Sequence, residues 1–191
     1  MTPTRRYYPV KRQVIQQPDD PTICHIPLTN GYFTVVDATE YERVSRYTWF
    51  AQLYWRKDGS IKYVYAYHKY RTATGLATWS LHRFITGVSD PLIKVDHWDR
   101  YGLNNRRLNL RVANKSQNGG NSNKSIANTS GFKGVSWHEH TKKWVAQICI
   151  NSKRIHLGLF STPEAAACVY DAAAIAHFGE FACLNFPRRA F

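Results

Sequence analysis

Apolar and polar positions along the chain predict several short strands and a few short helices. The segment 26–37 has strand composition, and the segment 38–47 carries its Glu residues early and its Arg residues late, as a short helix does. Two runs of aromatic and β-branched residues flank the turn sequence KDGS at 57–60 and predict a β-hairpin. The segment 78–87 has apolar residues at helical spacing and predicts a helix that ends at Gly87.

The segment 95–118, VDHWDRYGLNNRRLNLRVANKSQN, predicts the order strand, loop, strand and helix. A turn over residues 102–105 supports a hairpin, and Asn114 is expected to cap a short helix that carries Asn118. Neighbouring side chains on a strand point to opposite faces. Asp96 and His97 therefore face the same atom only where the strand ends or is bulged.

The C-terminal part begins with a stretch of different composition. Residues 119–130 are poor in apolar residues and rich in Gly, Ser and Asn, which predicts a linker. Three strand-like stretches follow, and then a helix with Thr162 as N-cap, Pro163 at its first position and Gly179 as its end. The residues expected in the core against this helix are Trp144, Ile148, Ile155, Leu157, the small residues at 165, 166, 172, 173 and 176, and Tyr170, Ile175 and Phe178.

Charge and cysteine content narrow the class of protein. The formal net charge is +13, from 26 Lys and Arg against 13 acidic residues, which predicts salt-sensitive binding to polyanions such as nucleic acids. No run approaches the ~20 apolar residues of a membrane span, and the N-terminus has no apolar signal core, so we expect a soluble, cytoplasmic protein. The four cysteines form no C-x-x-C pair; we expect reduced, mostly buried thiols and no structural zinc.

Four polar residues within 95–118 suit the hydrolysis of a phosphodiester. A neutral imidazole such as that of His97 can take a proton from water, and the oxygen atoms of Asp96 can hold Mg²⁺ or a similar ion beside a phosphate. Asn109 and Asn118 are the other two of these four polar residues. The same residue types also occur in polar hairpins, where their side chains satisfy turn backbone groups.

This segment resembles the HNH endonucleases, in the subgroup of phage and intron-encoded homing endonucleases, through DH at 96–97, NL at 109–110 and the final N of SQN at 118. The resemblance implies a ββα-metal core over about 93–118. It makes His97 the general base, Asp96 and Asn118 ligands of Mg²⁺ or Mn²⁺, and Asn109 the residue that orients His97. It also makes His82 possible active-site support, with a structural histidine beside an apolar face as the alternative. Arg83, Arg106, Arg107 and Arg111 are expected phosphate contacts, with a solvated basic face as the alternative for the last three.

Residues 131–187 resemble the APETALA-type DNA-binding domain of plant ethylene-response factors, through the elements KGV, KW, LG-F, EAA-YD-AA and LNFP in order. The resemblance implies a three-stranded antiparallel sheet, packed on one helix, that lies in the major groove of double-stranded DNA. The matching positions are Lys133, Ser136, His138, Gln147, Cys149, Arg154 and His156. Plant domains carry arginine at most of these positions, so only the binding mode is carried over and not the target sequence.

Together these observations predict an α+β protein of two domains. Residues 1–22 form a basic arm, which either touches DNA or has no particular role; 23–118 form the HNH domain, 119–130 the linker, and 131–187 the DNA-binding domain. The expected function is a phage-encoded, site-specific, metal-dependent DNA endonuclease that nicks one strand as a monomer. The alternative is a catalytically inactive, sequence-specific DNA-binding regulator.

Overall fold

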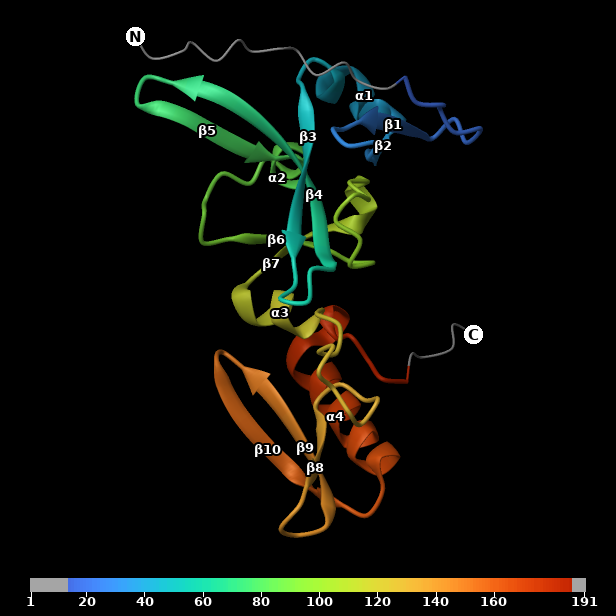
Figure 1. Cartoon of the computed structure of the whole chain (residues 1–191), viewed down its shortest axis with the longest axis vertical. Coiled ribbons are helices and arrows are strands. Elements are labelled where there is room, and N and C mark those ends of the chain that lie inside the picture. Colours follow the sequence, from blue (N-terminus) through green and yellow to red (C-terminus); the bar gives the residue numbers. More distant parts are fainter. Residues whose placement is uncertain (1–13, 187–191) are drawn as a thin grey trace. The chain divides into compact units, whose positions relative to one another are not determined.

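The computed structural model describes residues 14–186 and divides them into two units (Figure 1). Unit 1 combines the described part of residues 1–89 with residues 101–111, and unit 2 combines residues 90–100 with the described part of 112–191. The chain therefore crosses between the units twice within the segment that resembles an HNH motif. Residues 1–13 of the expected basic arm lie outside the described part.

Antiparallel strands make up most of unit 1. Its strands are β1 (Ile23–Pro27), β2 (Phe33–Asp37), β3 (Trp49–Trp55), β4 (Ile61–Thr72) and β5 (Gly75–Ser80). The first two pair with each other, and the other three form a sheet in the order β3-β4-β5. The hairpin expected around KDGS is present. The segment 26–37 is divided between two strands because Asn30 and Gly31 turn the chain with positive φ angles of 59° and 75°.

Two short helices complete the core of unit 1. They are α1 (Ala38–Ser45) and α2 (Leu81–Thr86), and α2 ends where the sequence predicts, at a left-handed Gly87 whose N–H donates to the carbonyl of Arg83 at 2.9 Å. Large apolar side chains fill the space between sheet and helices, among them Val36, Val44, Trp49, Leu81 and Ile85. Leu103 joins them from the returning loop, which is bound to β2 by hydrogen bonds of 2.8 Å on both sides of Val35.

Unit 2 contains the beginning and the end of the 95–118 segment, and residues 101–111 between them belong to unit 1. Strand β6 (Lys94–His97) pairs with β7 (Leu110–Ala113), which follows the 3-10 turn η1 (Arg107–Asn109). Helix α3 (Lys115–Gly120) comes next and is capped as expected. The side chain of Asn114 accepts the N–H of Gln117 at 2.8 Å, and the side chain of Gln117 accepts the N–H of Asn114 at 2.9 Å. The helix extends to Gly120 and the following Asn121 is buried, so the regular structure runs into the segment expected as a linker.

The rest of unit 2 is a three-stranded antiparallel sheet packed on one helix. The strands β8 (Val135–His138), β9 (Lys143–Ile150) and β10 (Lys153–Phe160) lie in the order β10-β9-β8, and α4 (Pro163–Phe178) packs on them, followed by η2 (Gly179–Phe181). Thr162 caps α4 by accepting the N–H of Ala165 at 3.2 Å, and Gly179 ends it. The sheet-plus-helix expectation for this region is confirmed.

Several expected core positions differ from the structure. Ile155 is 40% exposed, although its partner Ile148 on β9 is buried. On α4 the buried small residues are Ala166, Ala167 and Ala174, whereas Ala172 and Ala176 are exposed. The buried face of α4 is therefore centred on Tyr170. It is rotated about the helix axis from the face that the sequence predicts.

The prediction of mostly buried cysteines is wrong. Cys149 and Cys168 are exposed, and Cys24 and Cys183 are half-buried. Cys149 follows the buried Ile148 on β9 and so points to the opposite face of the sheet from α4.

Candidate functional site

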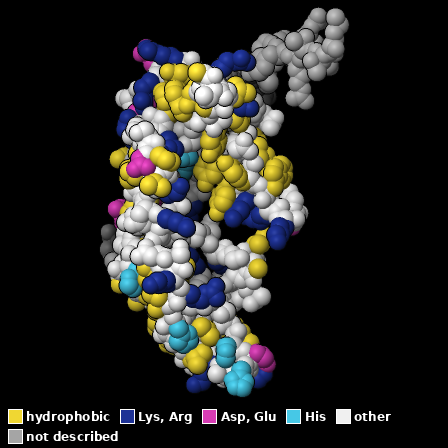
Figure 2. All heavy atoms as spheres, turned by 90° about the vertical axis from the view of Figure 1, so that its left-hand side faces the viewer, with side chains coloured by type: hydrophobic (Ala, Val, Ile, Leu, Met, Phe, Trp, Pro, Cys, Tyr) yellow, Lys and Arg dark blue, Asp and Glu magenta, His cyan; other side chains and the backbone are white. Residues whose placement is uncertain are grey.

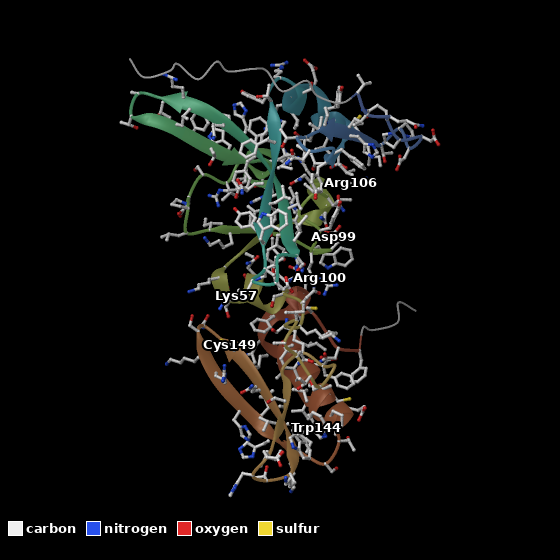
Figure 3. All side chains as sticks on the ribbon, in the orientation of Figure 1. Lys57, Asp99, Arg100, Arg106, Trp144 and Cys149 are labelled. Atoms are coloured by element: carbon white, nitrogen blue, oxygen red, sulfur yellow. The ribbon has the colours of Figure 1, made fainter. Side chains whose placement is uncertain are left out.

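Asp96 and His97 lie side by side at the end of β6, and both are buried, with 7% and 5% of their surface exposed. The strand stops at His97, and the chain then turns: the N–H of Arg100 donates to the carbonyl of His97 at 2.9 Å, and Arg100 has a φ of 66°. Asp99 and Arg100 lie in this turn (Figure 3). The strand therefore ends at His97, which is one of the two conditions under which neighbouring side chains can face the same atom.

Asn121 holds the Asp96 carboxylate, a contact that the sequence did not reveal. Its side-chain nitrogen lies 3.1 Å and 2.9 Å from the two oxygens of Asp96, 2.8 Å from the carbonyl oxygen of His97 and 3.5 Å from that of Trp98. A primary amide has two hydrogens, so the shortest distances assign one to Asp96 and the other to His97. Asn121 is itself only 6% exposed.

Asn118 lies on α3, three residues before Asn121, and its side chain is exposed. On a helix, positions three apart share a face, and Asn121 directly follows the helix end. The spacing from Asn118 to Asn121 is the signal by which sequence inspection could have found the second asparagine. In unit 2 the structure thus brings together Asp96, His97 and the end of α3.

Asn109 belongs to unit 1, where it is buried and braces its own loop. Its side-chain amide donates to the carbonyl of Asn104 at 2.7 Å, and its N–H donates to the carbonyl of Arg106 at 2.9 Å. The neighbouring Asn105 is 1% exposed and donates to the hydroxyl of Thr34 on β2 at 2.7 Å. Both asparagines therefore fix the course of the chain just before β7.

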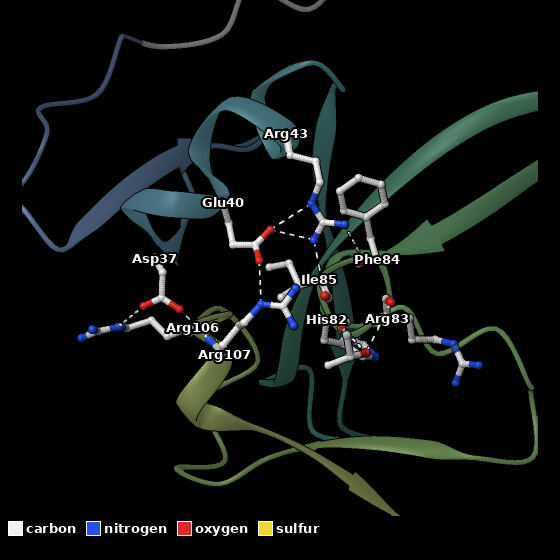
Figure 4. A network of polar contacts seen from close by, with 10 residues as sticks. Asp37, Glu40, Arg43, His82, Arg83, Phe84, Ile85, Arg106 and Arg107 are labelled. Carbon is white, nitrogen blue, oxygen red and sulfur yellow. Dashed lines mark hydrogen bonds and ion pairs between the residues drawn. The ribbon is translucent and has the colours of Figure 1, made fainter.

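Arg106 and Arg107, expected as phosphate contacts, are held in ion pairs within unit 1 (Figure 4). Nε of Arg106 donates to Asp37 at 2.9 Å, and Nε of Arg107 donates to Glu40 at 2.7 Å. Glu40 also accepts two bonds from Arg43, at 2.9 Å and 2.6 Å. Burial alone would raise the pKa of the Glu40 carboxyl, but the hydrogen bonds from Arg43 and Arg107 outweigh it and lower that pKa. The two arginines thus have an intramolecular role.

The remaining residues expected at the nuclease centre also lie in unit 1. His82, on α2, has its Nε2 3.1 Å from the hydroxyl of Ser80 and its ring 5.8 Å from that of Tyr65. Arg83 follows it and lines a cavity of about 530 Å³ together with Tyr67, Trp79 and Phe84. Arg111 is half-buried on β7. His82 and Arg83 come from the helix whose apolar side packs into the core, which fixes their position.

The sheet β8-β9-β10 presents most of the expected base- and phosphate-contacting positions on the face away from α4. Ala146 and Ile148 of β9 are buried against the helix side, so Gln147 and Cys149 alternate to the other face. Trp144 and Cys149 mark β9 in Figure 3. Arg154 pairs with Cys149 and His156 with Gln147 across β9 and β10, and His138 extends the row on β8. Figure 2 shows Lys and Arg side chains spread over one face of the molecule with few acidic side chains among them.

Lys133 differs from these sheet residues because its ammonium group forms a hydrogen bond within unit 2. It donates to the carbonyl of Gly120 at 2.6 Å, and burial lowers its pKa. Its backbone is bound to Asn185 of the LNFP element at 2.6 Å and 3.1 Å, and Asn185 in turn binds Asp171 of the YD element. The KGV, YD and LNFP elements are therefore joined by hydrogen bonds within this domain.

Comparison with known proteins identifies both halves of the chain. Residues 130–180 match the AP2 domain. An ethylene-responsive transcription factor of Arabidopsis thaliana is 50% identical over 58 residues, which cover 29% of this chain and 32% of that protein. An uncharacterized HNH endonuclease of Acanthamoeba polyphaga mimivirus is 32% identical over 160 residues, which cover 81% of this chain and 75% of that protein. The chain belongs to the HNH endonuclease family.

Within this HNH family member, the expected resemblance of the C-terminal region to the plant domains is confirmed, because the AP2 match covers β8 to α4. This chain spans only about a third of the plant factor. Among the described residues, no helix has the length and apolar character needed to cross a membrane. The part of the chain that the structure describes also holds no cluster of three or more His, Cys, Asp or Glu residues.

Unit 2 provides oxygen donors of the kind that a divalent metal binds. Mg²⁺ is commonly bound through one or two carboxylates, with water and substrate phosphate oxygens completing its shell, so it does not require three acidic residues. Asp96 supplies one carboxylate, and its partner is a neutral amide rather than a cation, so its negative charge is not neutralised by that contact. Asn118, whose side chain is exposed on α3, carries an amide oxygen.

Proposed function

We propose that the protein is a site-specific, divalent-metal-dependent DNA endonuclease of the HNH type that nicks one strand as a monomer. The observation that supports it most directly is the buried Asp96–His97 pair at the end of β6, with Asp96 held by a neutral donor from the end of α3. A buried carboxylate next to a buried histidine supplies the two residue types that a metal-assisted hydrolysis uses, a metal ligand and a base.

In this proposal His97 is the general base. Its imidazole accepts a proton from the attacking water, and its carbonyl, bound to Asn121, keeps the end of β6 in place. Asp96 and Asn118 would hold Mg²⁺ or Mn²⁺, which would stabilise the developing charge and the leaving 3′ oxygen. Asn109 fixes the loop that returns the chain to β7. The products would carry 5′-phosphate and 3′-hydroxyl ends.

The AP2 domain supports DNA binding, and we propose that it selects the site on double-stranded DNA. His138, Gln147, Arg154 and His156 lie on neighbouring strands of the sheet face opposite α4, where alternate side chains can reach base edges and phosphates of a major groove. Lys133 contributes to this domain as a bridge to Gly120. A DNA substrate implies an intracellular site of action.

The test is a nicking assay on supercoiled plasmid that carries DNA of the source genome. Wild type and the control His177→Ala, an exposed histidine of α4, are expected to convert it to open circles with Mg²⁺. His97→Ala, and wild type with EDTA, are expected to leave it intact, while gel shifts show that His97→Ala still binds DNA. Normal nicking by His97→Ala would remove the proposed base. Tight, specific binding by wild type without any conversion would favour the inactive regulator.

A further inference from the structure

The AP2 domain and the proposed metal site meet at two consecutive residues, Gly120 and Asn121. Both are buried, and both belong to unit 2. Asn121 points its amide at Asp96 and at the carbonyl of His97. Gly120 is packed and hydrogen-bonded on the AP2 side. Both residues lie in the segment 119–130, which was expected to be a linker, yet both are buried.

Gly120 fits only because it lacks a side chain. A Cβ atom placed there would lie 2.6 Å from Cγ of Phe178, the last residue of α4. The carbonyl of Gly120 accepts two further bonds from the AP2 region, from the N–H of Cys183 at 3.2 Å and from the ammonium of Lys133 at 2.6 Å. Three separate parts of the AP2 region therefore fix Gly120.

Other residues of the same segment are bound to the AP2 core as well. Ala113, at the end of β7, is buried in the cluster of Ile148, Tyr170 and Phe178. The hydroxyl of Ser116 on α3 accepts the N–H of Asn151 in the β9–β10 turn at 3.0 Å. The helix that carries Asn118 and leads to Asn121 thus rests on the AP2 domain along its length.

We propose that Asn121 is a positioning residue for the metal ligand Asp96, and that the AP2 domain sets its position through Gly120. This inference rests on the proposed metal-dependent nuclease function. Asn121 uses one hydrogen to orient the carboxylate and the other to hold the strand end that carries His97. Being neutral, it orients the charge of Asp96 without cancelling it. The AP2 domain is then a structural part of the nuclease centre as well as a DNA-binding domain.

The test measures Mn²⁺ binding to the full chain by electron paramagnetic resonance, with circular dichroism to verify folding. Asn121→Ala is expected to bind Mn²⁺ about 10- to 100-fold more weakly, the usual effect of removing a partner of a metal ligand. The exposed Asn123→Ala is the matched control and is expected to bind as wild type does. Asn121→Ser keeps a donor and is expected to fall between them; it replaces Asn121→Ala if that variant does not fold.

A pair of adjacent glycines tests the part played by the AP2 domain. Gly120→Ala forces Phe178 or α3 to move and is expected to weaken Mn²⁺ binding at least several-fold, although Gly120 is not itself a proposed ligand. Gly119→Ala is the control, because a Cβ at that position meets nothing within 4 Å. In nicking assays both Asn121→Ala and Gly120→Ala are expected to raise the half-saturating Mg²⁺ concentration, with the maximal rate largely recovered at high Mg²⁺.

The outcomes separate this inference from the proposed function. If wild type binds Mn²⁺ and nicks DNA while folded Asn121→Ala binds Mn²⁺ equally well, the positioning role is wrong and the nuclease proposal stands. If Asn121→Ala is impaired but Gly120→Ala matches Gly119→Ala, the contribution of the AP2 domain is wrong. If wild type binds no Mn²⁺, the proposed function and this inference fall together.

Discussion

Each unit of the protein holds buried or half-buried carboxylates, and the two units bind them with different donors. In unit 1, Asp37 and Glu40 are bound by the guanidinium groups of Arg106, Arg43 and Arg107 at 2.6–2.9 Å. In unit 2, Asp96 is bound by the neutral amide of Asn121 at 2.9–3.1 Å. Asp96 lies within the segment 94–118, and Asp37 and Glu40 bind Arg106 and Arg107 of that segment.

The donors decide what each carboxylate is able to do. A carboxylate paired with arginine is already neutralised, and binding a metal would require an ion pair to break. The pKa of Glu40 is lowered by those hydrogen bonds in spite of burial, so its negative charge is committed to holding α1 against the 106–107 segment. A neutral amide leaves the charge of Asp96 uncompensated by that partner. This contrast in donors is why Asp96, and not Asp37 or Glu40, is the proposed metal ligand.

The largest effect that this contrast predicts is on metal binding. Asp96→Ala is expected to lose Mn²⁺ binding in the same resonance experiment, and with it DNA nicking, because the only proposed charged ligand is gone. Asp37→Ala removes a carboxylate of equal charge from the arginine network and is expected to bind Mn²⁺ as tightly as wild type. If Asp37→Ala lost the metal and Asp96→Ala retained it, the assignment of the two carboxylates would be reversed.

The next effect is on the stability of unit 1. Glu40→Gln keeps the shape of the side chain but removes the charge that binds Arg43 and Arg107, and it is expected to lower the free energy of unfolding by about 2 kcal/mol. Urea unfolding followed by tryptophan fluorescence measures this change, since Trp49 is buried in the core of unit 1. A loss below about 0.5 kcal/mol would show that the buried pair adds no more than a surface pair.

The same variant predicts a pH dependence. The pKa of Glu40 is lower in the folded protein than its ordinary value, so the folded state favours the charged form. Its stabilising contribution is complete above the ordinary pKa of a glutamate and is lost as the pH falls through the lowered folded value. The difference in stability between wild type and Glu40→Gln is therefore expected to shrink between about pH 5 and pH 3. An unchanged difference across that range would contradict the lowered pKa.

Local signals in the sequence identified many of the elements correctly. The KDGS hairpin, the caps at Asn114 and Thr162 and the ends of α2 and α4 at Gly87 and Gly179 all depend on residues within a few positions of one another. The AP2 elements were recognised for the same reason, as short motifs in a fixed order.

The features that sequence inspection missed depend on distant partners. Asn121 meets Asp96 across 25 residues, and it sits in a Gly-, Ser- and Asn-rich stretch whose composition suggests a linker. Arg106 and Arg107 meet Asp37 and Glu40 across 69 and 67 residues, so nothing near them separates an ion pair from a phosphate contact. Ile155 has a core-like residue type, but α4 covers its neighbours Ile148 and Leu157 and leaves it exposed.

The smallest effect concerns an exposed pair on the same helix as Glu40. Glu42 binds Arg46 at 2.6 Å, a distance as short as the shortest bond of Glu40, but the side chains are 86% and 68% exposed. In water such an i,i+4 pair contributes little, so Glu42→Gln is expected to lower the free energy of unfolding by at most about 0.5 kcal/mol in the same urea experiment. The two glutamates differ by two positions in one helix, and their comparison isolates burial from distance. An effect of Glu42→Gln as large as that of Glu40→Gln would mean that short ion-pair distances, and not burial, determine which carboxylates of unit 1 are structural.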